Sequence, residues 1–455
     1  MALNAQRNWD VSMADNLSRM MLKSQESSEV NSQSMVYPVG TIFTLPFRAT
    51  KPAVHLPAEV IINIVQHIFE EKCDFRYVTP ATKQSNMHAC SLVSHDWNAA
   101  TIPFLYDTPW LQGPNYDLFT RTICPSVNIA VRKSPLANFV RHLNLTMLIH
   151  QGSKSTTARL LGRTKNNLEY FAAPQASFSL NCFPALSKCI VLTSLDLALV
   201  SEAVSLKTLF ETVSNLEKLK ELHLPRSAGF GASLEPGSII WPPRLEIIGL
   251  SGGLDAPFWY GYFRFPDTLS DIRITHCPKL DTSPLMGFLR GLKTQTPAAL
   301  SRMTFANLPR LGPEAVNTVL FYLPQLSFLS VSVDYISPAL LNPFYIGEEE
   351  LPLDTTFNES NEGKAVKLEY LELTDSGDIN DVEKFTPIDV LIAMADYRTL
   401  PLLTCVTVEK SVGWFSDDQA GELNELDELL VTQAKERGNY SSNGVGVKML
   451  RSLGR

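Results

Sequence analysis

The hexapeptide Leu192-Thr193-Ser194-Leu195-Asp196-Leu197 contains the pattern that decides the fold of this chain, with leucines at its first, fourth and sixth positions. Apolar and polar residues alternate over its last four positions, which predicts a short strand with one buried face. The chain is therefore predicted to repeat one structural unit along most of its length. Further copies, some with other large apolar residues, begin at Val140, Leu168, Leu219, Leu245, Leu269, Leu300, Leu326, Leu368 and Leu403.

The spacing of these copies is nearly regular. From Leu168 to Leu326, successive copies begin 24, 27, 26, 24, 31 and 26 residues apart. Five of these six steps fall within the period of about 20–29 residues of leucine-rich repeats, which the pattern resembles. Cys277 stands where such repeats carry Asn or Cys, so the resemblance implies a buried structural thiol there.

A repeat of this kind consists of a short strand and a helix or tight turn. Because one such unit cannot bury its own apolar face, neighbouring units must stack. The predicted fold is α/β: a leucine-rich-repeat solenoid over residues 139–410, with parallel strands on the concave face and helices outside, preceded by a small all-α module.

The small module is predicted from a second apolar pattern. In Leu56-Pro57-Ala58-Glu59-Val60, the proline fits a first helical turn and Glu59 lies near the positive end of the helix dipole. The apolar residues of this helix cover an arc of roughly 200°, whereas packing on one side of a small domain needs little more than about 100°. The surplus predicts a second contact surface, with another part of this chain or with another chain.

A second helix is predicted over roughly Met87 to Ala100, where Cys90, Val93 and Trp97 recur at helical spacing. Residues 70–86, between the two helices, are rich in charge, and Pro80 is expected to interrupt any helix there. This segment is predicted to be an inserted surface loop. From periodicity alone, the two helices are equally consistent with an ordinary helical hairpin core.

Taken in order, Leu-Pro-x-Glu-Val, the aliphatic helix, Cys90-Ser91-Leu92-Val93-Ser94-x-x-Trp97 and Pro103-x-Leu105-Tyr106 resemble an F-box in its fungal style. The resemblance implies a three-helix module that docks on a Skp-type adaptor, which links it to a cullin-based ubiquitin ligase. The segment at 70–86 is longer than the link usual in this motif. The residues that match the framework, and that are expected to bind the adaptor, are Leu56, Pro57, Val60, Ile64, Leu92, Val93 and Trp97.

The remaining segments complete the predicted organisation. Residues 1–50 are polar and are expected to form a disordered leader, and residues 51–107 form the F-box-like module. A connector occupies 108–138. An acidic insertion interrupts the solenoid at 334–366, and residues 411–455 are expected to form a C-terminal capping helix and a tail.

Composition excludes several classes of function. The chain has 455 residues, a net charge of −8 and no long Lys/Arg run, so nucleic acid is not an expected partner. Seven scattered cysteines without a Cys-x-x-Cys motif indicate neither a disulfide framework nor a zinc site, and favour the cytosol or nucleus. No signal peptide or membrane-spanning run is recognisable, and no metal or cofactor is expected.

No catalytic motif is found, so partner recognition is assigned to the polar positions between the apolar residues of the repeats. Strand alternation turns these positions towards the concave face, where the alternative is a plain solvated surface. A lining of mixed charge with Arg and Tyr suits a protein surface. The predicted target-binding residues are His142, Asn144, Asp196, Glu221, His223, Asp271, Arg273, Arg302, Tyr370 and Glu372, with Thr275, Thr304, Ser330 and Glu409 also expected to line this face.

The sequence therefore predicts a non-catalytic substrate receptor of a Skp–cullin–F-box ubiquitin ligase, in which other subunits carry out the transfer chemistry. One alternative is an F-box and repeat scaffold for protein assembly that engages no cullin. A second alternative, an enzyme built on a repeat platform, is disfavoured by the missing motifs.

Overall fold

The computed structural model describes residues 56–70, 79–125, 134–148, 153–226, 239–261, 264–295, 297–342, 366–377, 385–395, 399–438 and 444–450. The predicted leader, residues 1–50, lies outside this range. The chain divides into two compact units, Met1–Trp110 and Leu111–Arg455. No described helix is long and apolar enough to cross a membrane.

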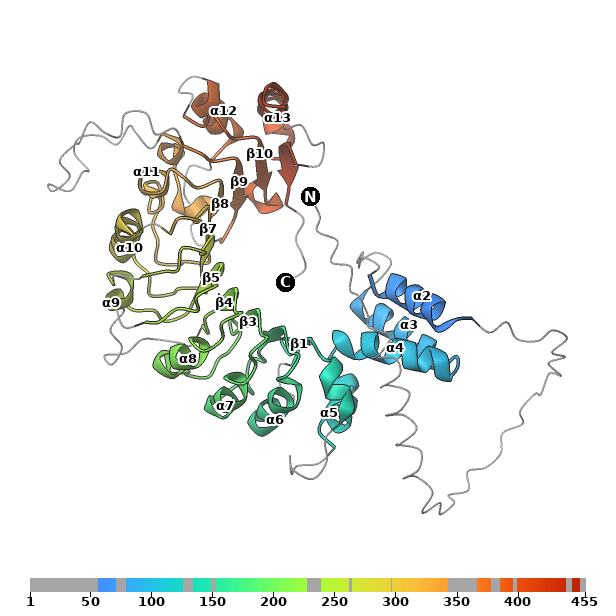
Figure 1. Ribbon diagram of the computed structural model, residues 1–455. Coiled ribbons are helices and arrows are strands. Elements are labelled where there is room, and N and C mark those ends of the chain that lie inside the picture. Colours follow the sequence, from blue (N-terminus) through green and yellow to red (C-terminus); the bar gives the residue numbers. More distant parts are fainter. Residues whose placement is uncertain are drawn as a thin grey trace, which may run out of the picture. The chain divides into compact units, whose positions relative to one another are not determined.

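The first unit contains three described helices, α2 (Ala58–Glu70), α3 (Pro80–Ser91) and α4 (His95–Asp107) (Figure 1). Their shared core consists of the buried Ile61, Val65, Met87 and Phe104. Half-buried apolar side chains pack around this core, namely Leu56, Ile68, Phe69, Trp97, Ala100 and Leu105.

Two expectations for this unit are wrong. Pro80 does not interrupt a helix but begins α3, because proline at the first helical position loses no intrahelical hydrogen bond. Thr79 caps this helix, since its Oγ1 accepts a hydrogen bond from the Thr82 amide at 3.1 Å. The predicted loop at 70–86 is therefore helical from residue 80, and its residues 71–78 lie outside the described range.

The predicted helix from Met87 to Ala100 is in fact two helices. The chain turns after Ser91, and Ser94 begins α4 with its Oγ accepting from the Trp97 amide at 3.3 Å. In the interior of a helix, a serine side chain competes for the hydrogen bonds of the backbone. At the N-terminus it instead accepts a hydrogen bond from a backbone amide that has no partner within the helix. The turn leaves Leu92 and Val93 between the two helices.

The second unit confirms the predicted solenoid. Its described strands form an eleven-stranded parallel sheet in sequence order, and in Figure 1 they line the inner side of this unit while its helices lie outside. The strands are β1 (His142–Asn144), β2 (Tyr170–Ala172), β3 (Ser194–Asp196), β4 (Glu221–His223), β5 (Ile247–Leu250), β6 (Asp271–Thr275), β7 (Arg302–Ala306), β8 (Phe328–Ser332), β9 (Tyr370–Thr374), β10 (Cys405–Val408) and β11 (Gly446–Met449).

Helices lie between the strands along the chain, except that α5 and η1 precede β1. The α-helices are α5 (Pro114–Ile123), α6 (Lys154–Thr164), α7 (Phe183–Leu186), α8 (Leu206–Val213), α9 (Ala256–Trp259), α10 (Thr282–Thr294), α11 (Val319–Tyr322), α12 (Pro387–Ala395) and α13 (Ala420–Glu436). The 3-10 helices are η1 (Pro135–Phe139), η2 (Leu180–Cys182), η5 (Val333–Tyr335), η6 (Pro338–Leu341), η8 (Lys410–Val412) and η9 (Asp417–Gln419).

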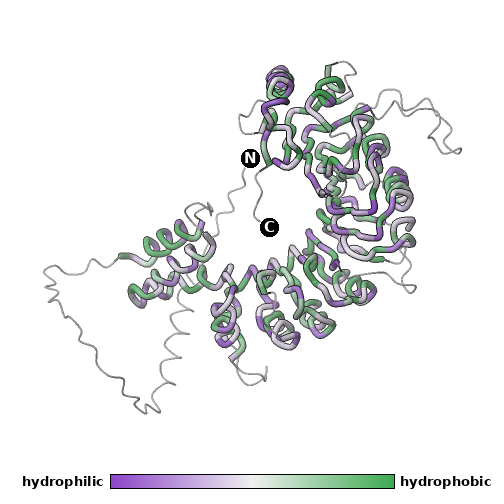
Figure 2. Tube along the Cα trace, turned by 180° about the vertical axis from the view of Figure 1, so that it is seen from behind, coloured by the Kyte–Doolittle hydropathy of each residue, from purple (hydrophilic) through white to green (hydrophobic). Residues whose placement is uncertain are grey.

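The fourth position of each repeat forms one row across the sheet, in register from strand to strand. These side chains are almost completely buried beneath the helices, which explains why the pattern demands a large apolar residue there. Figure 2 shows hydrophobic and hydrophilic residues interspersed along the strands and helices of this unit. The row consists of Leu143, Phe171, Leu195, Leu222, Ile248, Ile272, Met303, Leu329, Leu371 and Val406, with Val447 as its last, half-buried member.

The ends of two predicted segments differ from the structure. The sheet continues past residue 410, because β11 pairs in register with β10 and places Val447 beside Val406. Residues 334–342 belong to the repeat core rather than to the acidic insertion predicted at 334–366. The apolar side chains of Tyr335, Leu340 and Leu341 are buried there, and residues 343–365 lie outside the described range.

Candidate functional site

Helix α2 has two apolar stripes. Ile61 and Val65 are 2% and 0% exposed and face the core of the first unit. Val60 and Ile64, each one residue earlier and also four apart, are 41% and 37% exposed. Because residues four apart lie on one side of a helix, Val60 and Ile64 form a second stripe, which the described residues of this unit leave exposed. This second stripe accounts for the surplus apolar width of the sequence pattern.

The turn between α3 and α4 exposes two more large apolar side chains. Leu92 and Val93 are 71% and 63% exposed, more than most large apolar residues of a folded domain. Pro57 is exposed as well, whereas Leu56 and Trp97 are half-buried against the core. Of the predicted adaptor-binding residues, five are thus available to a partner and two support the helices.

The ten predicted target-binding residues all lie in the second unit, on strand positions that flank the buried row. His142, Glu221, Asp271, Arg302 and Tyr370 precede that row, in register across their strands. The remaining five follow the buried row, at the next outward position, and are Asn144, Asp196, His223, Arg273 and Glu372.

Sequence analysis did not identify two aromatic residues in the outward-facing row that directly precedes the buried row. Tyr170 and Phe328 occupy the same position as Arg302 and Tyr370, directly before the buried residue of their repeats. Their position within the repeat could have identified them as outward-facing, but an aromatic residue next to a core position is normally interpreted as part of the core. Both are half-buried on the outward side of the sheet.

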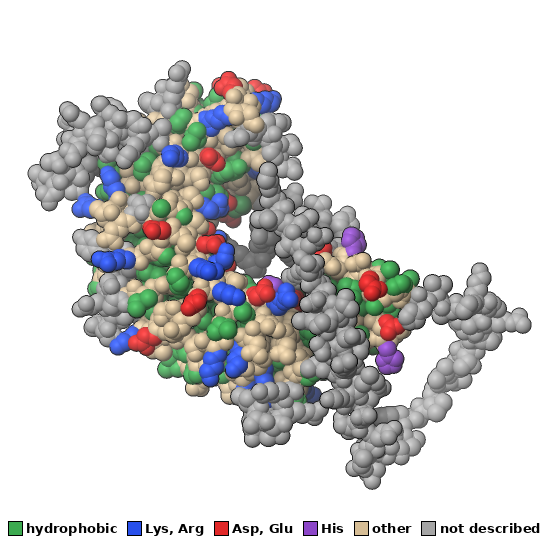
Figure 3. Space-filling view, viewed as in Figure 1, with side chains coloured by type: hydrophobic (Ala, Val, Ile, Leu, Met, Phe, Trp, Pro, Cys, Tyr) green, Lys and Arg blue, Asp and Glu red, His purple; other side chains and the backbone are tan. Residues whose placement is uncertain are grey.

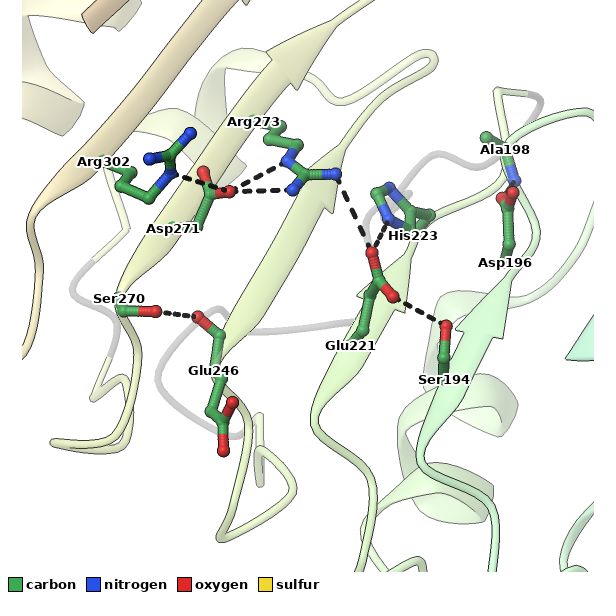
Figure 4. Close-up of polar contacts among 10 residues, drawn as sticks. All are labelled: Ser194, Asp196, Ala198, Glu221, His223, Glu246, Ser270, Asp271, Arg273 and Arg302. Atoms are coloured by element: carbon green, nitrogen blue, oxygen red, sulfur yellow. Dashed lines mark hydrogen bonds and ion pairs between the residues drawn. The ribbon is translucent and has the colours of Figure 1, made fainter. Parts of the chain in front are cut away.

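Glu221 is the centre of one polar cluster on this face (Figure 4). Its Oε1 lies 2.9 Å from His223 Nε2, and its Oε2 accepts a hydrogen bond from Ser194 Oγ at 2.8 Å. The hydrogen bond with His223, reinforced by that from Ser194 and by the Arg273 charge, lowers the pKa of Glu221 to about 2. Glu221 is therefore an anion at neutral pH, with its acceptors already occupied.

Two further residues are related to this cluster: Gly249 makes room for it, and Tyr170 is affected by its charge. Gly249 lies beside His223 in the same row, and a Cβ at Gly249 would overlap the His223 ring. The absent side chain therefore lets the imidazole reach Glu221. Burial, with the charges of Asp196 and Glu221, raises the pKa of Tyr170 to about 12, so this phenol stays protonated.

Asp271 is the centre of a second cluster, drawn beside the first in Figure 4. Arg273 Nε and Nη2 lie 3.0 and 2.9 Å from Asp271 Oδ2, and Arg302 Nε lies 3.8 Å from the same oxygen. The Asp271 side chain is only 5% exposed. The Asp271 carboxylate therefore contacts two arginines, Arg273 of its own strand and Arg302 of the adjacent strand β7, and its role in target binding stays a prediction.

The other polar positions are engaged more locally. Asn144 and Asp196 accept hydrogen bonds from the backbone amides of Thr146 and Ala198 in the turns after their strands. Glu372 accepts a hydrogen bond from Ser330 Oγ at 2.8 Å. On the face of the second unit shown in Figure 3, Lys and Arg side chains are interspersed with Asp and Glu.

The polar clusters on this face pair acids with arginines, with an imidazole and with serine hydroxyls. The described part of the chain has no group of three or more His, Cys, Asp or Glu that could hold a metal ion. Burial raises the pKa of the Cys277 thiol to about 12, which fits the structural role expected for this residue.

Comparison with curated proteins finds two relatives, whereas no family model matches the chain. The chain is 32% identical to "F-box protein YDR306C" of Saccharomyces cerevisiae over 337 residues, which cover 73% of this chain and 65% of that protein. It thus spans slightly less than two thirds of this relative. It is also 26% identical to "Protein pof5" of Schizosaccharomyces pombe over 333 residues, 73% of this chain and 86% of that protein.

Two solved structures show weaker likenesses. A chain of the Rad7 and Elc1 complex from yeast has a TM-score of 0.41 at 14% identity, covering 98% of this chain and 96% of that chain. An internalin of Listeria monocytogenes has a TM-score of 0.25 at 12% identity, covering 74% of this chain and 90% of that chain. The fold assignment rests on the strand register described above and not on these two likenesses.

Proposed function

This chain is a homologue of an F-box protein over 73% of its length, and from that premise we propose that it is a non-catalytic substrate receptor of a Skp–cullin–F-box ubiquitin ligase. The helices α2–α4 dock on a Skp-type adaptor, and the outward face of the sheet binds a target protein. Ubiquitin transfer then takes place on other subunits, in the cytosol or nucleus, and this chain supplies proximity.

The observation that carries the docking proposal is the exposed apolar surface of the first unit. A full contact with an aliphatic side chain contributes about 1.5–3 kcal/mol to binding, by removing it from water. Val60, Ile64, Leu92 and Val93 each offer part of this contribution, because the fold leaves them exposed. A surface of this kind is typical of interfaces between proteins.

The matched test replaces two exposed pairs, one on each unit. Val60→Gln with Ile64→Gln keeps good helix formers in α2 and removes about 1 kcal/mol of contact per residue. We expect the dissociation constant of the full chain for a purified Skp-type adaptor to rise at least about tenfold, measured by titration calorimetry. The control, Ile388→Gln with Ile392→Gln, removes a similarly exposed pair from α12 and should leave the affinity unchanged.

Equal affinities for the two double variants would mean that α2 does not contact the adaptor. The cullin-independent scaffold is tested separately, by purifying the protein from cells. Recovery of the adaptor together with a cullin supports the ligase receptor. Recovery of the adaptor alone, under conditions that keep other ligase complexes intact, favours the scaffold.

A further inference from the structure

We infer that Arg302, Phe328 and Tyr370 form the anchor for the target, and that they take a peptide segment with a carboxylate side chain beside an apolar one. The inference deepens the proposed function and rests on it. These three residues, called the arginine–aromatic patch below, occupy in-register positions on β7, β8 and β9. Because neighbouring strands lie about 4.8 Å apart, the patch spans about 10 Å, the reach of a few peptide residues.

The Arg302 guanidinium is held in place before any partner binds. Its Cζ lies 3.7 Å from the centre of the Phe328 ring, and its Nε lies 3.8 Å from the buried Asp271 Oδ2. The side chain is nevertheless 46% exposed, and its two terminal nitrogens have no acceptor within the described residues. A stacked and tethered arginine loses less side-chain entropy on binding than a free one.

The charge balance of the neighbouring strands selects an anionic partner. Arg273 donates a hydrogen bond from Nε to Asp271 Oδ2, its Nη2 forms an ion pair with the same oxygen at 2.9 Å, and its Nη1 lies 3.8 Å from Glu221, so its charge is compensated. Among the described acids, Arg302 is paired only with Asp271, at the longer distance of 3.8 Å. A cationic side chain would thus face Arg302, whereas a carboxylate can pair with its free edge by two parallel hydrogen bonds.

The same balance favours a carboxylate over a phosphate. A phosphate carries nearly two negative charges and is best held by several cations. Here the charge of one arginine, Arg302, is only partly compensated. Two acids lie on strands close to it, Asp271 on the adjacent strand β6 and Glu372 on β9, two strands away. A singly charged carboxylate matches this site better than a phosphorylated residue does.

The aromatic half of the patch supplies the apolar contact. Tyr370 is exposed, and Phe328 is half-buried beside it. Tyr and Arg are among the residues that dominate binding energy at protein interfaces, where they act as rigid anchors. An apolar side chain one or two residues from the carboxylate would therefore cover these two rings.

The test uses the full chain and a library of synthetic dodecapeptides in which one position is fixed in turn as Glu, Gln, phosphoserine or Lys. We expect the Glu peptides to bind about tenfold more tightly than the Gln peptides, and Arg302→Gln to remove this difference. Phe328→Leu should weaken the binding of both Glu and Gln peptides, because it removes part of the apolar contact from each. Arg310→Gln is the control, because Arg310 is also exposed with a carboxylate 3.8 Å away but lies outside the strands.

A preference for Lys, for phosphoserine over Glu, or for no residue would overturn the inference, as would a Glu preference that survives Arg302→Gln. Adaptor affinity of the same preparations keeps the two proposals apart. Normal adaptor binding without Glu selection refutes the patch and leaves the proposed function intact. Glu selection without adaptor binding refutes the proposed receptor and leaves a peptide site.

Discussion

At the scale of single residues, the outward face of the sheet is set by which charges compensate one another. Asp271 shares one oxygen between two arginines, and Glu221 shares its two oxygens among Ser194, His223 and Arg273. Both oxygens of Glu221 therefore already have partners, and the Asp271 side chain is only 5% exposed. The sequence could place these residues on one face through strand alternation, but it could not show which of them would be consumed by their neighbours.

Glu221 makes the stability of the second unit depend on pH. Its pKa is lowered from 4.5 to about 2 in the folded state, so its ionised form stabilises the fold above pH 4.5. This contribution is lost as the pH falls from 4.5 through 2. Because the Glu221 side chain is 28% exposed, solvent screening reduces the contribution to about 1 kcal/mol.

Urea unfolding of Glu221→Gln and of the unchanged protein measures this contribution. We expect the variant to be less stable by about 1 kcal/mol at pH 6, and the difference to shrink steadily between pH 5 and pH 2. Thr304→Ala, a neutral change on the same face, should show a difference that does not vary with pH. A constant difference for Glu221→Gln would show that its charge contributes nothing to folding.

At the scale of helices and strands, the first unit depends on how its helices begin. Ser94 caps α4 through a hydrogen bond to the Trp97 amide. We expect Ser94→Ala to lower the free energy of unfolding of the first unit by about 1 kcal/mol, measured by the denaturant midpoint of that unit. Ser205 also precedes a helix, α8, but its side chain makes no capping hydrogen bond, so Ser205→Ala should have little effect. Similar costs for the two would mean that the Ser94 cap is not formed in solution.

The repeats were predictable at this scale and the helix ends of the first unit were not. A leucine at the fourth position of a repeat has one physical role, to be buried under the helices, so its recurrence identifies the sheet. Pro80 and Ser94 each have two readings, as a helix breaker or as a helix start. Local sequence does not choose between them, because the choice depends on packing of α3 and α4 against α2.

Phe328 in the second unit was not predicted for a related reason, since an apolar residue beside a core position gives no sign of facing outward.

At the scale of the whole molecule, the two units present different surfaces: the first has exposed apolar side chains and the second has a polar sheet face. A sheet of stacked repeats also has two end strands, and an unprotected end can pair with another chain. In the second unit α13 protects β11, because Asp427 Oδ1 accepts a hydrogen bond from the Val447 amide at 2.7 Å. Gly446 permits this contact, since a Cβ there would overlap the Asp427 carboxylate.

Asp427→Ala should therefore loosen the end of the sheet without unfolding the rest. A hydrogen bond to a charged acceptor contributes about 1.5–3 kcal/mol, so we expect the Val447 amide to exchange with solvent at least about tenfold faster, measured by hydrogen–deuterium exchange. Amides of β6, five strands away in the sheet, serve as the internal reference and should not change. Asp427→Asn keeps an oxygen acceptor and should retain most of the protection. If the Val447 amide exchanges equally fast in Asp427→Ala and Asp427→Asn, the Asp427 side chain does not hold β11. Pairing with β10 alone then maintains the end of the sheet.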